Sequence, residues 1–265
     1  MKSSFGALLL PRRCLLCRCY TTHPFFAERH SSAYAPFVCQ ACATGFEPFV
    51  RPVCSLCGHP FPGGHAADHH CLPLAGDRGL KGGLIRSGYR YAGGMVEIIH
   101  QWKYGKRSLV VPLVEKLVDL ALERWAVDFQ DVAVVGAIPL APPSFRSRGF
   151  NQALIIASRC ASRLDKPLQR RLLVKARETK KQASLGREQR RQNLAGVFHV
   201  GSPDGVAAKT VMLCDDVMTS GATLSAASEA LLLAGAAAVK CFTLCRVERG
   251  RDQSKIADHG VPQPR

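Results

Sequence analysis

Residues 211–223, which read VMLCDDVMTSGAT, decide the fold of this chain. An apolar run of the kind that forms a buried strand leads into two adjacent carboxylates, Asp215 and Asp216, and then into a turn of small and hydroxyl residues. Apolar residues at helical spacing follow the turn. The stretch therefore predicts a strand, a tight loop and the start of a helix, which is where parallel α/β sheets bind their ligands.

The loop after the two carboxylates suits a phosphate monoester. Successive backbone N–H groups at a helix N-terminus form an anion nest, which the helix dipole reinforces. The carboxylates can accept hydrogen bonds from a vicinal diol or bind a hydrated divalent cation, so the pattern predicts a ribose phosphate with Mg²⁺. The alternative is a helix-capping hydroxyl after a strand-ending Asp. The predicted phosphate loop, which lacks the Walker and GxGxxG patterns, consists of Thr219, Ser220, Gly221, Ala222 and Thr223.

Short apolar runs alternate with stretches of helical periodicity around this unit. Such alternation predicts an α/β fold in which helices cover both faces of a parallel sheet. Pro112 is expected in the first turn of its helix. The predicted strands cover residues 87–91, 132–138, 209–214 and 239–247, and the predicted helices cover residues 95–104, 112–125, 151–164 and 222–234.

Eight of the twelve cysteines precede residue 72 and predict a separate small module. The CxxC pairs Cys14/Cys17 and Cys39/Cys42 have the spacing of a four-thiolate zinc site, because a two-residue spacer lets both sulfurs face one ion. A disulfide framework and a redox CxxC are the alternatives. The N-terminus has no secretory signal pattern, so we expect a reducing, cytoplasmic environment in which zinc is favoured.

A third pair, Cys54/Cys57, is followed by Cys71, but Leu74 stands where a matching second knuckle would have its last cysteine. A second zinc site would therefore need a histidine as its fourth ligand. The alternative is that the histidines near this pair are solvated loop residues. The candidate histidines are His59, His65, His69 and His70, and the four later cysteines, Cys160, Cys214, Cys241 and Cys245, are expected to be buried small hydrophobic residues.

The composition is that of a folded protein with an anionic partner. Of the 265 residues, 47% are hydrophobic and 21% are charged, and the formal net charge is +16. Residues 141–200 hold 14 Lys and Arg against three Asp and Glu, which is most of the excess. No apolar window is long enough to span a membrane. The polar residues 249–265 are expected to be a disordered tail.

Three stretches together resemble the ComF family of competence-associated proteins. Residues 211–223 resemble the signature with which type I phosphoribosyltransferases bind phosphoribosyl pyrophosphate (PRPP), although Ser220 replaces the commoner Thr. Residues 138–152, with the string RGFNQ, and residues 177–198 extend the resemblance to nearly the whole chain. The family joins a double zinc ribbon to a phosphoribosyltransferase-type domain, which implies a zinc module at 1–75 and a second domain at 84–248. Leu74 departs from the cysteine pattern of the family's second zinc ribbon.

The resemblance also implies roles for individual residues. Asp215 and Asp216 would hold the ribose hydroxyls, and the phosphate loop would hold the 5′-phosphate. The segment after the strand at 132–138 would bind pyrophosphate, for which guanidinium forks are suited. The candidates there are Arg146 and Arg148, and a loop that would close over the site contains Arg177, Lys180 and Lys181.

Two classes of function are consistent with these features. The first is an enzyme that transfers phosphoribose from PRPP with Mg²⁺ and releases pyrophosphate, in DNA uptake or nucleotide utilisation. The second is a non-catalytic competence protein that binds single-stranded DNA, contacts the DNA-uptake machinery and uses the PRPP pocket for regulation. Aromatic residues make up only 7% of the chain, which gives little support for a ladder of base-stacking side chains.

Overall fold

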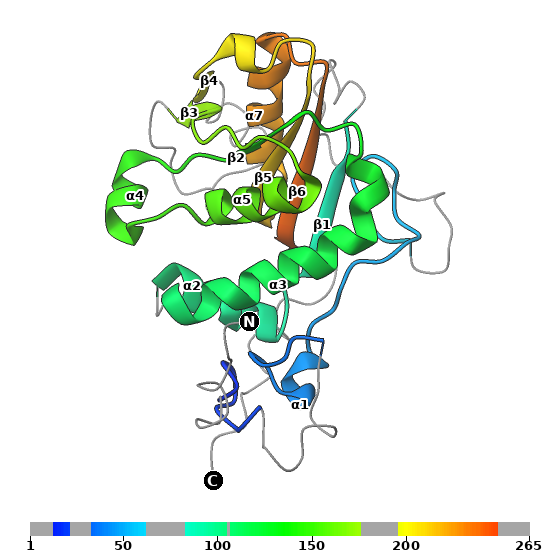
Figure 1. Cartoon of the computed structure of the whole chain (residues 1–265), viewed down its shortest axis with the longest axis vertical. Coiled ribbons are helices and arrows are strands. Elements are labelled where there is room, and N and C mark those ends of the chain that lie inside the picture. Colours follow the sequence, from blue (N-terminus) through cyan, green and yellow to red (C-terminus); the bar gives the residue numbers. More distant parts are fainter. Residues whose placement is uncertain (1–12, 22–32, 62–82, 105–106, 176–195, 249–265) are drawn as a thin grey trace, which may run out of the picture.

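A four-stranded parallel sheet forms the centre of the protein (Figure 1). The computed structural model describes residues 13–21, 33–61, 83–104, 107–175 and 196–248. Neighbouring strands are parallel in every pair, which confirms the predicted α/β sheet. In their order across the sheet, the strands are β1 (Ile85–Arg90), β6 (Ala238–Arg246), β5 (Thr210–Met218) and β2 (Val134–Ala137).

Helices cover both faces of this sheet. On one face α3 (Arg107–Trp125) contacts β1, and α5 (Gln152–Leu164) contacts β2 and β5. On the other face α7 (Ala222–Leu233) contacts β5 and β6 (Figure 1). Because both faces are covered, all nine residues of β6 are buried, as expected for a central parallel strand. The four later cysteines are also fully buried, as predicted.

Two of the predicted boundaries are wrong. Helix α3 begins at Arg107 and contains Pro112 inside it, so the proline does not mark its start. The buried apolar face that includes Leu113 and Leu117 offsets the one backbone hydrogen bond that the proline removes. Strand β5 continues past the two carboxylates to Met218, because its pairing with β6 stays in register beyond Cys214.

Several short elements have no strong periodic signal in the sequence. Helix α2 matches the helix predicted at residues 95–104, but strands β3 and β4, which pair in an antiparallel arrangement beside the main sheet, were not predicted. Short segments of this kind give too few residues for periodicity to identify them. The remaining elements are α1 (Gln40–Ala43), α2 (Gly94–Tyr104), η3 (Ala126–Phe129), α4 (Pro142–Arg148), β3 (Leu173–Lys175), β4 (Phe198–Val200) and η5 (Pro203–Gly205).

The segment around the third CxxC pair runs along the outer edge of β1. Phe49 donates its backbone N–H to Gly88, and Ile85 donates its own to Leu56. These bonds satisfy an edge that would otherwise expose unpaired backbone groups. The N-terminal module is thus attached to the sheet through main-chain contacts. No helix in the described ranges is long and apolar enough to cross a membrane, and the predicted tail lies outside them.

Candidate functional site

Two adjacent carboxylates lie in the last part of β5. Asp215 Oδ1 accepts the backbone N–H of Asp216 at 2.8 Å, and Asp216 Oδ1 accepts that of Val217 at 2.7 Å. Burial, together with the negative charge of Asp216, raises the pKa of Asp215 to about 8. Burial and the neighbouring charge therefore favour the protonated form of Asp215, and a bound cation would favour the charged form.

A cation from another element faces the second carboxylate. Lys103 Nζ of α2 lies 2.7 Å from Asp216 Oδ2, and both side chains are mostly buried. Sequence reasoning missed this lysine, because the two residues are far apart along the chain and no local motif links them. Only the packing of α2 near the end of β5 brings them together.

The loop after β5 borders a small open hollow. Gly221 has a φ of +75° and forms the N-cap of α7, so the chain turns sharply from the strand into the helix. The Oγ of Ser220 accepts the backbone N–H of Ala222 at 3.4 Å. The predicted strand, loop and helix are therefore present, and the hollow is lined by Asp215 and by Val217, Met218, Thr219, Ser220, Gly221, Ala222, Thr223 and Leu224.

The predicted pyrophosphate segment follows β2 and includes α4. Asn151 donates its side-chain amide to Ile138 O at 2.9 Å and caps α5 by accepting from Ala153 N, so the two ends of the segment are held together. Arg146 is exposed on α4 and does not line the hollow. The side chain of Arg148 and the whole of Arg177, Lys180 and Lys181 lie outside the described residues.

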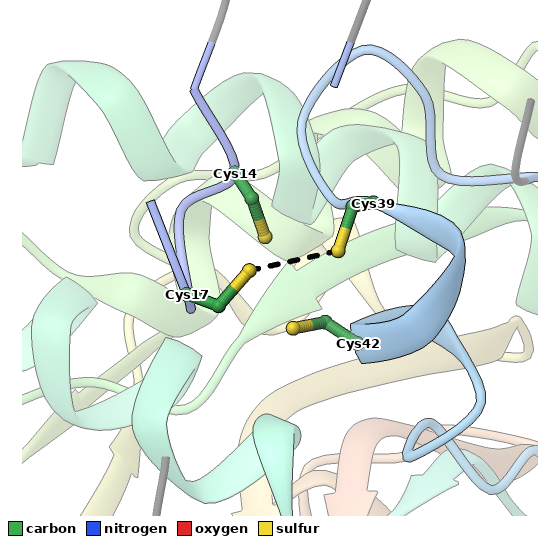
Figure 2. A group of neighbouring side chains, drawn as sticks. All are labelled: Cys14, Cys17, Cys39 and Cys42. Carbon is green, nitrogen blue, oxygen red and sulfur yellow. Dashed lines mark hydrogen bonds between the residues drawn. The ribbon is translucent and has the colours of Figure 1, made fainter. Parts of the chain in front are cut away.

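The first two CxxC pairs form a cluster of four thiols (Figure 2). All four Sγ atoms lie within 4.8 Å of one another, and those of Cys17 and Cys39 are 3.6 Å apart. A tetrahedral site with Zn–S bonds of about 2.3 Å has S···S separations of about 3.8 Å, so the thiols fit a zinc ion. The members of the cluster are Cys14, Cys17, Cys39 and Cys42.

The thiols of this cluster differ in how readily they ionise. Burial opposes ionisation of Cys17, but hydrogen bonds from the backbone of Cys19 and from neighbouring thiols outweigh it and lower its pKa to about 7. Burial raises the pKa of Cys14 and of Cys42. A metal that binds here would displace protons from these buried thiols, since the thiolate is the ligand.

The first and third CxxC pairs adopt the same backbone turn. In the first, Arg18 donates its N–H to Cys14 O, and in the third, Gly58 donates to Cys54 O; both distances are 3.0 Å. Arg18 and Gly58 both have positive φ, at 62° and 65°. Cys54 and Cys57 are buried at this turn, whereas Cys71, His65, His69 and His70 lie outside the described residues. The second zinc site stays a prediction.

Comparison with known proteins agrees with this architecture. Residues 151–263 match the family model described as "Phosphoribosyl transferase domain". The DNA utilization protein YhgH of Escherichia coli K12 is 29% identical over 158 residues, which cover 59% of this chain and 69% of that protein. Competence protein F of Haemophilus influenzae is 28% identical over 152 residues, which cover 56% of this chain and 66% of that protein.

A solved structure also resembles part of the chain. The purine phosphoribosyltransferase from Pyrococcus horikoshii is 19% identical with a TM-score of 0.30, and the match covers 49% of this chain and 81% of that one. The family model and the relatives agree with the resemblance seen in the sequence: residues 151–263 are similar to the phosphoribosyl transferase domain, and the chain is a homologue of bacterial proteins named for DNA utilization and for competence.

Proposed function

We propose that this chain binds PRPP with Mg²⁺ and transfers its phosphoribosyl group to a nucleophile, with pyrophosphate as the leaving group. One observation carries the proposal. The carboxylates Asp215 and Asp216 lead within one strand–loop–helix unit into the hollow at the N-terminus of α7. A phosphate held by the loop would then lie next to a diol or cation held by the carboxylates, which is the arrangement that a ribose phosphate requires.

The loop would hold the 5′-phosphate. Backbone N–H groups at the start of α7 can donate to this phosphate, and so can the hydroxyls of Thr219, Ser220 and Thr223. Asp215 and Asp216 would accept from the ribose hydroxyls. Mg²⁺, when bound, would supply positive charge to the diphosphate and make it a better leaving group.

The transfer needs positioning more than a side-chain nucleophile. The bond from C1 of the ribose to the pyrophosphate oxygen breaks as a new bond forms from C1 to the acceptor. Charge develops on the departing pyrophosphate, and fixed cations that meet it lower the barrier. Arg146, exposed on α4 after β2, is the described candidate for this role, and Arg148, Arg177, Lys180 and Lys181 stay candidates from the sequence.

Structural zinc would complete the N-terminal module. We expect one ion at the first thiol cluster, because its sulfur spacing fits a tetrahedral shell. A second ion at Cys54, Cys57 and Cys71 would need a histidine ligand. We retain the division into a zinc module at 1–75 and a transferase-type domain at 84–248, in a cytoplasmic protein.

A DNA-binding role is the second candidate. It is favoured by the positive excess of residues 141–200 and by the names of the two relatives, DNA utilization protein and Competence protein F. In that case single-stranded DNA would release counterions on binding, and log affinity would fall by about 0.7 per neutralised phosphate for each decade of salt. The PRPP pocket would then regulate contact with DNA or with the uptake machinery.

Calorimetry with PRPP and Mg²⁺, followed by a screen of acceptor bases for pyrophosphate release, tests the proposal. We expect saturable PRPP binding that requires Mg²⁺, and release of pyrophosphate with at least one acceptor. PRPP binding without release, together with salt-dependent oligonucleotide binding that PRPP alters, would favour the regulatory alternative. A folded protein without affinity for PRPP would contradict both.

A further inference from the structure

Lys103 is held in place by the helix that carries it. Its neighbour Trp102 is fully buried, and the Trp102 ring lies 6.4 Å from that of Phe150. Phe150 immediately precedes Asn151, whose side chain bonds to Ile138 at the other end of the predicted pyrophosphate segment. Helix α2 is therefore anchored beside this segment, while Lys103 reaches the carboxylate of Asp216.

The ion pair between Lys103 and Asp216 contributes little as a structural contact. The two side chains are only 20% and 14% exposed, so the cost of desolvating both charges offsets much of the attraction between them. The position of this ion pair indicates more about its role than its contribution to stability does. The lysine neutralises one of the two groups that the proposed function assigns to the ribose and to Mg²⁺.

A lysine is suited to exchange partners at such a site. Its ammonium sits on four methylene groups and carries three donors, so it can leave one oxygen and reach another without movement of the helix. PRPP brings negative phosphate oxygens to the same region. When a cation occupies Asp216, these oxygens become the nearest negative partners for Lys103.

We propose that Lys103 is a positioning residue for the phosphoribosyl site. In the ligand-free protein its ammonium neutralises Asp216. When Asp216 binds Mg²⁺, the ammonium contacts the diphosphate of PRPP instead. This inference rests on the proposed function for its ligand. It adds a residue that no local motif identifies and a sequence of events in which free Mg²⁺ competes with Lys103.

The test is calorimetry on Lys103→Met and Lys103→Arg in the full chain, with Mg²⁺ alone and with PRPP in saturating Mg²⁺. Loss of the ammonium should tighten the binding of Mg²⁺ alone several-fold, because the competing cation is gone. The same variant should bind PRPP about tenfold or more weakly, since a charge-assisted contact is lost. Lys103→Arg keeps the charge and should stay near wild type.

Lys240→Met is the matched control. Lys240 pairs with Asp131, near the opposite ends of the strands, and its loss should leave both affinities unchanged. The inference is wrong if folded Lys103→Met binds both ligands as wild type does, or binds Mg²⁺ more weakly as well as PRPP. Absence of PRPP binding by the wild type would instead contradict the proposed function, whereas the Mg²⁺ titration would still decide whether Lys103 competes for Asp216.

Discussion

Arg86 is one of the residues that join the N-terminal module to the sheet. Its side chain is 2% exposed, and its Nη1 donates to Ser55 O at 3.1 Å and to Ile85 O at 2.8 Å. Its Nε donates to Asp128 Oδ2 at 2.9 Å, and Arg51 donates to the same oxygen at 2.7 Å. A buried guanidinium needs such partners, because an unpaired buried charge is strongly destabilising.

The titration of Asp128 should make stability depend on pH in the acid range. Burial opposes its ionisation, but hydrogen bonds and charge from Arg86 and Arg51 outweigh burial and lower its pKa below the ordinary 3.8. As pH falls, Asp128 is therefore protonated at a higher pH in the unfolded chain than in the folded protein. The stabilising contribution is fully present above the ordinary pKa and is lost as pH falls through the lower pKa of the folded state.

Urea unfolding between pH 3 and pH 6 on wild type and Asp128→Asn measures this contribution. We expect the variant to be less stable at pH 6 and to lose less stability on acidification. Asp204→Asn, which changes an exposed carboxylate, should keep the wild-type slope. Parallel pH profiles for wild type and Asp128→Asn would show that this ion pair contributes nothing to the acid limb.

Residues that act within one local motif could be predicted from the sequence, whereas residues that act across the fold could not. Asp215 and the loop to Thr223 are adjacent in sequence, so their chemistry and spacing are visible there. Lys103 and Arg86 meet partners that are distant along the chain, and nothing in their own segments indicates a partner. Such pairs follow from strand order, which periodicity does not determine.

At the scale of elements, the two ends of α7 allow a matched comparison. Gly221 precedes the helix with a φ of +75°, and Gly235 follows it with a φ of +94°. A residue with a Cβ is disfavoured at positive φ by about 1 to 2 kcal/mol. Gly221→Ala should therefore lower the free energy of unfolding by about that amount and also weaken PRPP binding, because the backbone of the phosphate loop must shift.

Gly235→Ala separates the two effects. It should lower the free energy of unfolding by a similar amount but leave PRPP affinity unchanged, since Gly235 lies at the other end of the helix. Thermal unfolding and calorimetry on both variants give the comparison. Equal PRPP affinities for the two alanine variants would mean that the conformation of Gly221 does not matter to the ligand.

Elements with strong periodicity were predicted well, and their ends less well. The helix expected at 151–164 is α5, Gln152–Leu164, with Asn151 as its capping residue. Strand β5 is longer than expected because β6 supplies backbone partners beyond Cys214, and this pairing outweighs the low strand propensity of Asp215 and Asp216. The antiparallel pair of β3 and β4 was missed, because each strand has only three residues.

At the scale of the whole molecule, the segment of the third CxxC pair and the sheet are parts of one structure. The segment of the third CxxC pair shares backbone hydrogen bonds with β1, and Arg246 at the end of β6 donates to Cys57 O. Val247 donates its N–H to Met218 O, next to the phosphate loop. We therefore expect loss of the module to affect the stability of the sheet.

Zinc content tests the first thiol cluster. Protein made under zinc-replete, reducing conditions should contain at least one zinc per chain, and Cys39→Ser should lose one and unfold at a lower temperature. Cys19→Ser is the control, because Cys19 Sγ lies 3.2 Å from Cys17 Sγ but is not one of the four members. Zinc-free wild-type protein would refute the site, and two ions would indicate that a histidine completes a second one.

PRPP binding should depend on the acid pair of β5, and the double variant Asp215→Asn with Asp216→Asn tests this dependence. Each lost charge-assisted hydrogen bond should cost about 1.5 to 3 kcal/mol of binding free energy. Calorimetry with PRPP and Mg²⁺ should therefore detect no binding by the variant, while circular dichroism shows the wild-type fold. A folded double variant that binds PRPP with wild-type affinity would show that Asp215 and Asp216 do not bind PRPP.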